Sequence, residues 1–173
     1  YVSLFEEGYG VIRFEGLRNH PEEIVFRAIS RIAQLIGGRQ YPHRFERLKR
    51  LVASLQSKET ATFSSCLWIA EKDKLLVCRE IRKLEIAPGL YDIQNHQEEK
   101  GIKIRALGEE GWHLLRAEHP LLKGTVLPKP VLFSLVSFWQ DDHIIAVPHL
   151  NYYKDEDRFK PYLSFIGKKR LKR

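Results

Sequence analysis

The spacing of the hydrophobic residues changes partway along the chain, near Ser57-Lys58. Before this point, apolar residues recur at steps of three and four, which is the period of a helix with one buried face. After it, apolar and polar residues alternate, which is the period of a half-buried strand. The sequence therefore predicts an α+β protein. We expect a helical segment over residues 1–58, followed by a mixed domain over residues 59–173 with two β-hairpins and one or two helices.

Two helices are expected in the first segment. Asn19 is a suitable N-cap for the first helix, Pro21 is tolerated in its opening turn, and Gly37-Gly38 is a suitable stop. The second helix follows Pro42. Apolar residues at helical spacing are Ile24, Ala28, Ile29, Ile32, Leu35 and Ile36 in the first helix, and Phe45, Leu48, Leu51, Val52 and Leu55 in the second.

The mixed domain shows two hairpin patterns. The first joins the alternating stretch 60–70 to the apolar stretch 75–81 through a polar turn, and the second joins 135–139 to 143–147 around Asp141-Asp142. Residues 102–106 read as a further strand. Residues 109–119 read as a helix with Trp112 and Leu115 on its inner side.

The charge balance favours an anionic partner. There are 29 Lys and Arg against 22 Asp and Glu, a net charge of +7, and basic residues displace the condensed counterions of phosphates. We therefore expect nucleic acid before membrane. No apolar run approaches the roughly 18 residues that a membrane-spanning helix needs. Two cysteines are too few for a secreted disulfide scaffold, so a cytoplasmic location is expected.

The basic residues are concentrated around the second helix and the first hairpin. Between Arg39 and Lys58 there are six Lys and Arg and one acid, Glu46. The candidate RNA-binding residues are Arg39, Arg44, Arg47, Lys49, Arg50, Arg79, Arg82 and Lys83. A solvated helix face is the alternative interpretation of the same charges.

No residue pattern predicts catalysis or a metal site. The sequence has no phosphate-binding loop, and Cys66 and Cys78 each lack a nearby second cysteine. Asp92 with Glu98-Glu99-Lys100 resembles the carboxylate and lysine motif of a nuclease, but the pattern is more typical of a solvated loop. Asp141-Asp142-His143 reads as a turn. The basic tail 167–173 reads as solvated and mobile.

Several segments resemble, in order, the C-terminal half of bacterial tRNA-isoleucine lysidine synthetases. They run from Gly8-Tyr9 to Leu17, from Gly37-Gly38-Arg39 to Tyr41-Pro42, from Thr60 to Cys66, from Leu76 to Glu80 and from Ala146 to Leu150. The basic tail departs from the common form of that family.

The resemblance implies a function in tRNA modification. That family joins lysine to the wobble-position cytidine of an isoleucine tRNA, which implies tRNA as a partner, with ATP and Mg²⁺ used by an N-terminal catalytic domain. The S-G-G-x-D-S loop of that domain does not occur here, so no catalytic residue is carried over. The chain contains no Met and starts at Tyr1, so we expect a piece of a longer protein whose catalytic domain acts in cis. A basic protein-interaction module, including a homodimer, stays open as an alternative, and an independent hydrolase is the least favoured.

Overall fold

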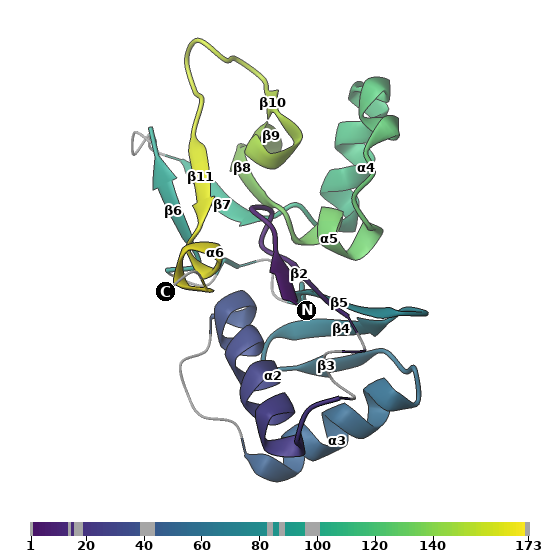
Figure 1. Ribbon diagram of the computed structural model, residues 1–173. Helices are drawn as coiled ribbons and strands as arrows, with labels where there is room; N and C mark the ends of the chain where they lie inside the picture. Colours follow the sequence, from purple (N-terminus) through teal and green to yellow (C-terminus); the bar gives the residue numbers. More distant parts are fainter. Residues whose placement is uncertain are drawn as a thin grey trace. The chain divides into compact units, whose positions relative to one another are not determined.

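The computed structural model describes residues 2–13, 15, 19–38, 44–82, 85–86, 89–95 and 101–171, apart from the side chains of Lys123, Lys169 and Leu171. The chain divides into two compact units (Figure 1). Unit 1 is Tyr1–Glu80 together with Ile166–Arg173, and unit 2 is Ile81–Phe165. Both combine helices with antiparallel sheet, so the expected α+β class is confirmed. The boundary between the units lies later in the sequence than the expected one near Ser57-Lys58, because the helices before Ser57 and the strands after it belong to unit 1.

Unit 1 contains a five-stranded antiparallel sheet in the order β1-β2-β5-β4-β3. Its strands are β1 (Val2–Leu4), β2 (Gly10–Arg13), β3 (Ala61–Phe63), β4 (Cys66–Ala70) and β5 (Lys74–Arg79). The stretch 60–70 was expected as one strand, but it holds two, joined by a turn at Ser64-Ser65 where φ is 53° and 61°. Because β2 pairs with β5, β5 is an interior strand and is buried except at Lys74.

Helix α2 (Glu22–Gly37) provides much of the core of unit 1. The expected cap is wrong: Pro21, with φ −53° and ψ 143°, occupies the N-cap, and no side chain caps the helix. Asn19 lies outside the helix because the extended backbone of Pro21 delays its start. Gly38 ends it with φ 74°, as expected from the left-handed conformation that glycine favours. Ile24, placed on the apolar face from its spacing, is 49% exposed.

Two further helices belong to unit 1. Helix α3 (Phe45–Gln56) buries Leu48, Leu51 and Leu55, and the Phe45 ring meets Phe26 of α2 edge-on at 5.0 Å. Helix α6 (Ile166–Leu171) contacts α2, and Lys168 forms an ion pair of 3.0 Å with Glu6. The basic tail was expected to be solvated and mobile; up to Leu171 it is instead a helix with partners in unit 1.

Unit 2 is built on a four-stranded antiparallel sheet in the order β10-β9-β8-β7. A separate antiparallel pair joins β6 to β11. The strands are β6 (Tyr91–Gln94), β7 (Ile102–Ala106), β8 (Val136–Gln140), β9 (His143–Val147), β10 (Tyr152–Tyr153) and β11 (Tyr162–Phe165). The helices are α4 (Gly108–Glu118) and α5 (Lys129–Ser134), with 3-10 turns η1 (Pro120–Gly124) and η2 (Pro148–Leu150).

The core of unit 2 lies on both sides of β8. Trp139 packs with Trp112 and Leu115 of α4, whereas its neighbour Phe138 packs with Phe159. Asp141 and Asp142 join β8 to β9 with φ of 47° and 61°, the left-handed pair of a tight two-residue hairpin turn. This turn fixes where β9 begins, at His143. No helix among the described ranges is long and apolar enough to cross a membrane.

Candidate functional site

Helix α3 separates its apolar and basic residues onto different faces. Leu48, Leu51 and Leu55 are buried, whereas Arg44, Arg47, Lys49 and Arg50 are exposed. Arg47 and Arg50 are three residues apart and are therefore neighbours on the helix surface. Arg44 precedes the helix in an extended conformation and occupies its N-cap position. We call Arg44, Arg47, Lys49 and Arg50 the α3 basic face.

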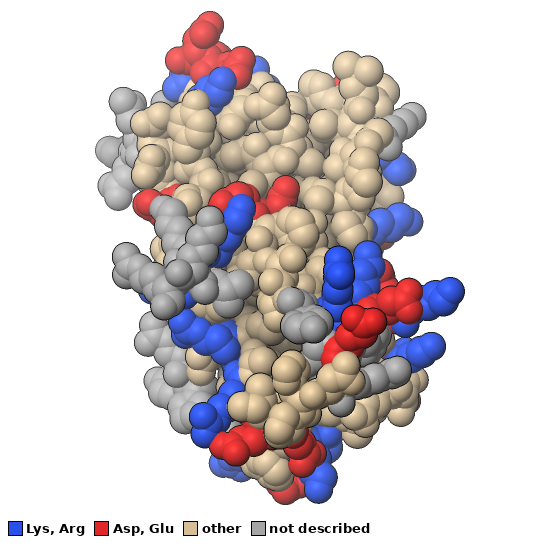
Figure 2. Space-filling view, in the orientation of Figure 1, with Lys and Arg blue, Asp and Glu red and all other residues tan. Residues whose placement is uncertain are grey.

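The α3 basic face is not neutralised by neighbouring carboxylates. Within the described part of the chain, none of its four side chains forms an ion pair. On α2, by contrast, Arg27 contacts Glu23 at 2.6 Å. Figure 2 shows Lys and Arg intermixed with Asp and Glu over the surface in view. Cations without intramolecular partners are available to an anionic ligand.

Of the remaining candidate RNA-binding residues, Arg79 and Arg82 are among the described residues. Arg79 is 7% exposed because it ends the interior strand β5, so its side chain is largely withdrawn from solvent. Arg82 is exposed but belongs to unit 2. Arg39 and Lys83 lie outside the described residues.

The two thiols lie in the interior of unit 1. Cys66 and Cys78 are both fully buried, and Cys66 Sγ donates a hydrogen bond to the Ala33 carbonyl at 3.6 Å. Burial raises the pKa of Cys78 to about 12 and raises the pKa of Cys66 further, with Cys78 adding to the shift of Cys66. Thiols that stay protonated are poor nucleophiles. Among the described residues, no three His, Cys, Asp or Glu side chains are grouped so that they could hold a metal ion.

The acidic motifs of the sequence lie partly outside the described residues, and the described ones are surface or turn residues. Asp92 lies on β6 and accepts a hydrogen bond from Gln94 at 3.3 Å, whereas Glu98-Glu99-Lys100 lies outside the described residues. Asp141 and Asp142 form the hairpin turn described above.

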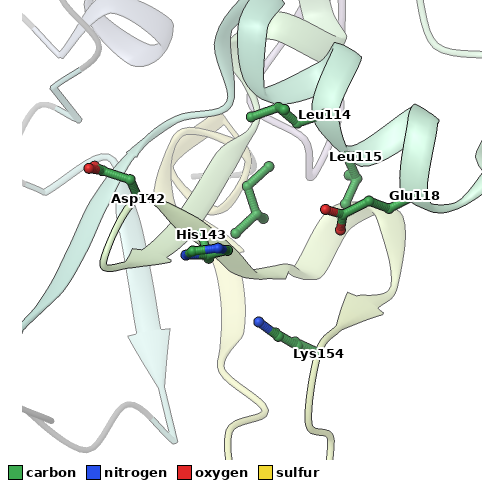
Figure 3. Close-up of a pocket in the computed structure, with 7 residues that line it drawn as sticks. Leu114, Leu115, Glu118, Asp142, His143 and Lys154 are labelled. Atoms are coloured by element: carbon green, nitrogen blue, oxygen red, sulfur yellow. The ribbon is translucent and has the colours of Figure 1, made fainter.

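Unit 2 contains a pocket of about 200 Å³ between α4 and β9 that the sequence analysis missed. Its apolar wall is formed by Leu114, Leu115 and Ile144, and Lys154 follows β10 at its edge. In Figure 3 the Glu118 carboxylate and the Lys154 amino group are both directed into the space in front of β9, while Asp142 points away. We call this the α4–β9 pocket. Its residues are far apart in the sequence, so no local pattern could have identified it.

The walls of the α4–β9 pocket are fixed by contacts within unit 2. The Tyr152 hydroxyl donates to the Ile144 carbonyl at 3.4 Å, and the Tyr152 ring lies 4.8 Å from that of His119, just after α4. Burial raises the pKa of Tyr152, and the Glu118 carboxylate raises it further, which indicates that this carboxylate lies near the phenol. The backbone N–H of Lys154 donates to the Ile145 carbonyl at 2.9 Å.

Comparison with known proteins gives one informative similarity. The chain is similar to tRNA(Ile)-lysidine synthase of Ruegeria pomeroyi. The two are 27% identical over 154 residues, which cover 85% of the chain but 36% of that synthase. The chain thus spans about a third of the length of this relative. No family model matches the chain, and no solved structure matches it.

Several of the segments that carry the resemblance to the synthase family meet in unit 1. A Cβ atom on Gly37 would lie 2.1 Å from the Ser64 carbonyl oxygen and 3.0 Å from Cys66 Sγ. Gly37 therefore allows the end of α2 to touch the turn between β3 and β4. The sequence explained this glycine as part of a helix stop. The close approach gives a second structural reason for glycine at this position.

Proposed function

We propose that this chain is the tRNA-recognition part of a tRNA(Ile)-lysidine synthase. The α3 basic face carries the proposal, because it presents four exposed cations that form no ion pair within the described part of the chain. The similarity to the Ruegeria pomeroyi synthase supports tRNA as the anion. In this role the chain contributes binding, while a separate catalytic domain uses ATP and Mg²⁺ to join lysine to the wobble-position cytidine.

The basic face would act on the phosphate backbone. Arg and Lys contacts to phosphates position a nucleic acid and carry no base information. Double-stranded RNA is recognised mainly by its shape and by its phosphates and 2′-hydroxyls. We therefore expect Arg44, Arg47, Lys49 and Arg50 to hold the tRNA body through phosphate contacts. Arg79 has no part in this surface because it is buried.

A charge-reversal experiment tests the proposal. The Arg44→Glu/Arg47→Glu variant is compared with Lys72→Glu/Lys129→Glu, which makes the same change in net charge at two exposed lysines that are not part of α3. Electrophoretic mobility shift with tRNA measures the affinity of each. We expect the α3 variant to lose at least tenfold in affinity and the control to lose much less.

Two outcomes contradict the proposal. Equal losses in the two variants mean that only the overall charge attracts RNA. Absence of tRNA binding by the unsubstituted chain, together with a dimer in sedimentation that the α3 substitutions dissociate, supports the protein-interaction alternative instead.

A further inference from the structure

The α4–β9 pocket carries opposite charges that do not neutralise each other. Glu118 and Lys154 are both exposed, and in the described part of the chain neither forms an ion pair with the other or with any third side chain. Figure 3 shows both groups directed into the same space. This arrangement leaves a hydrogen-bond acceptor and a donor on either side of a gap in which a ligand can lie.

His143 adds an oriented ring at the edge of this gap. Its Nδ1 lies 2.8 Å from the Asp141 carbonyl oxygen, and because a carbonyl only accepts, Nδ1 carries the proton. This hydrogen bond ties the ring to the rigid β8–β9 turn. An imidazole held in this way offers a flat surface to a stacked aromatic ligand.

The volume of the pocket is suited to one planar ring system, and its lining combines three apolar residues with four polar or charged ones. Cavities of about 150 Å³ hold a benzene ring, and the α4–β9 pocket measures about 200 Å³ with an apolar wall of Leu114, Leu115 and Ile144. A free amino acid matches the two charges, but exposed ion pairs contribute little to binding. A nucleobase gains more binding free energy, because its faces lie against apolar and aromatic groups.

Among the bases, guanine matches the polar groups best. Its Watson–Crick edge presents the acceptor O6 beside two donors, N1–H and N2–H₂. A carboxylate has two acceptor oxygens and can accept from both donors, while an ammonium donates to O6. Adenine presents a single donor group beside N1, cytosine has one donor group beside two acceptors, and uracil has one donor between two acceptors.

We propose that the α4–β9 pocket binds an unstacked guanine of the bound RNA, with Glu118 accepting from N1–H and N2–H₂, Lys154 donating to O6 and His143 against the base face. This inference rests on the proposed function, because it adds base recognition in unit 2 to phosphate contacts in unit 1. Sequence-specific recognition of RNA generally uses such unstacked bases.

Titration of the full chain with the four nucleoside 5′-monophosphates tests the inference. All four carry the same phosphate, so a difference among them reports base recognition. In ¹H–¹⁵N spectra we expect GMP to shift the amides of Leu115, Glu118 and Ile144 and to bind at least fivefold more tightly than AMP or UMP. In Glu118→Gln the preference for GMP should fall at least fivefold. Glu110→Gln is the matched control, because Glu110 is an exposed carboxylate on the same helix outside the pocket.

The opposing results are equally definite. Equal binding of all four nucleotides with no effect of Glu118→Gln indicates phosphate contact with Lys154 alone and overturns the inference. Tighter binding of glycine or lysine than of GMP identifies the pocket as an amino-acid site and overturns the inference. The absence of any amide shift with GMP also overturns the inference. If GMP does not bind while tRNA binding still depends on Arg44 and Arg47, the guanine site is refuted and the proposed function stands. If GMP binds but tRNA does not, the proposed function is lost.

Discussion

Gly37 allows the end of α2 to approach the turn between β3 and β4 closely. In Gly37→Ala the new methyl group would lie 2.1 Å from the Ser64 carbonyl oxygen, a backbone atom that cannot rotate away. Forced overpacking of this kind costs about 1–3 kcal/mol, and we expect a loss of that size in the free energy of unfolding. Urea denaturation measures it. Gly124→Ala is the control, because a Cβ there meets no atom within 4 Å; similar losses in both variants would contradict the packing described here.

The buried thiols predict a loss of stability in alkaline solution. The pKa of Cys78 is raised from its ordinary value of 9.0 to about 12 by burial. The unfolded chain therefore releases this proton at a lower pH than the folded chain does. The stability contribution is complete below pH 9 and is lost as the pH rises toward 12, by up to about 1.4 kcal/mol per pH unit. Denaturation between pH 8 and 11 should show a shallower decline in Cys78→Ala, and equal slopes in the two proteins would contradict it.

Single residues show where sequence reasoning stops. Cys66 and Cys78 are both buried, as the apolar strand patterns around them would indicate. Arg79 was grouped with the basic residues around the first hairpin, and the pairing of β2 with β5 that buries it is not visible locally. Glu118, His143 and Lys154 come together only through the tertiary structure of unit 2.

At the scale of elements, the buried face of α3 is expected to stabilise the fold and its exposed face to bind tRNA. Leu51 is 4% exposed, and truncating a buried leucine costs about 2–5 kcal/mol. We expect Leu51→Ala to lower the free energy of unfolding by that amount. Arg47→Ala on the exposed side should change it by no more than about 0.5 kcal/mol while weakening tRNA binding. Chemical denaturation and mobility shift on the same preparations test this, and a large loss of stability in Arg47→Ala would show that the basic face has a structural role.

The helices were the more predictable elements. The spacing of apolar residues located α2, α3 and α4 to within a few residues, because each turn of a helix depends on near neighbours. Strands β1 and β2 were missed: they are three and four residues long, and β2 pairs with a strand more than sixty positions away, at Gly10 and Val77. The pairing of β6 with β11 was missed for the same reason, since it joins residues far apart in the sequence, such as Tyr162 and Gln94.

At the scale of the molecule, the chain returns to unit 1 after completing unit 2. The contacts of α6 with α2 and the ion pair between Lys168 and Glu6 attach the last described residues to the first unit. A division based on composition could not foresee this, because the seam near Ser57 separates elements that pack together. The change of hydrophobic period marks a change of secondary structure and not a domain boundary.

The salt dependence of tRNA binding tests the central claim most directly. If the four cations of the α3 basic face each contact a phosphate, the logarithm of the association constant should fall with the logarithm of salt concentration with a slope of about −3 to −4. In Arg44→Gln/Arg47→Gln the slope should become shallower by about 1.5–2, since two contacts are removed. A slope near zero for the unsubstituted chain, or the same slope in both proteins, would contradict the assignment of tRNA binding to this face.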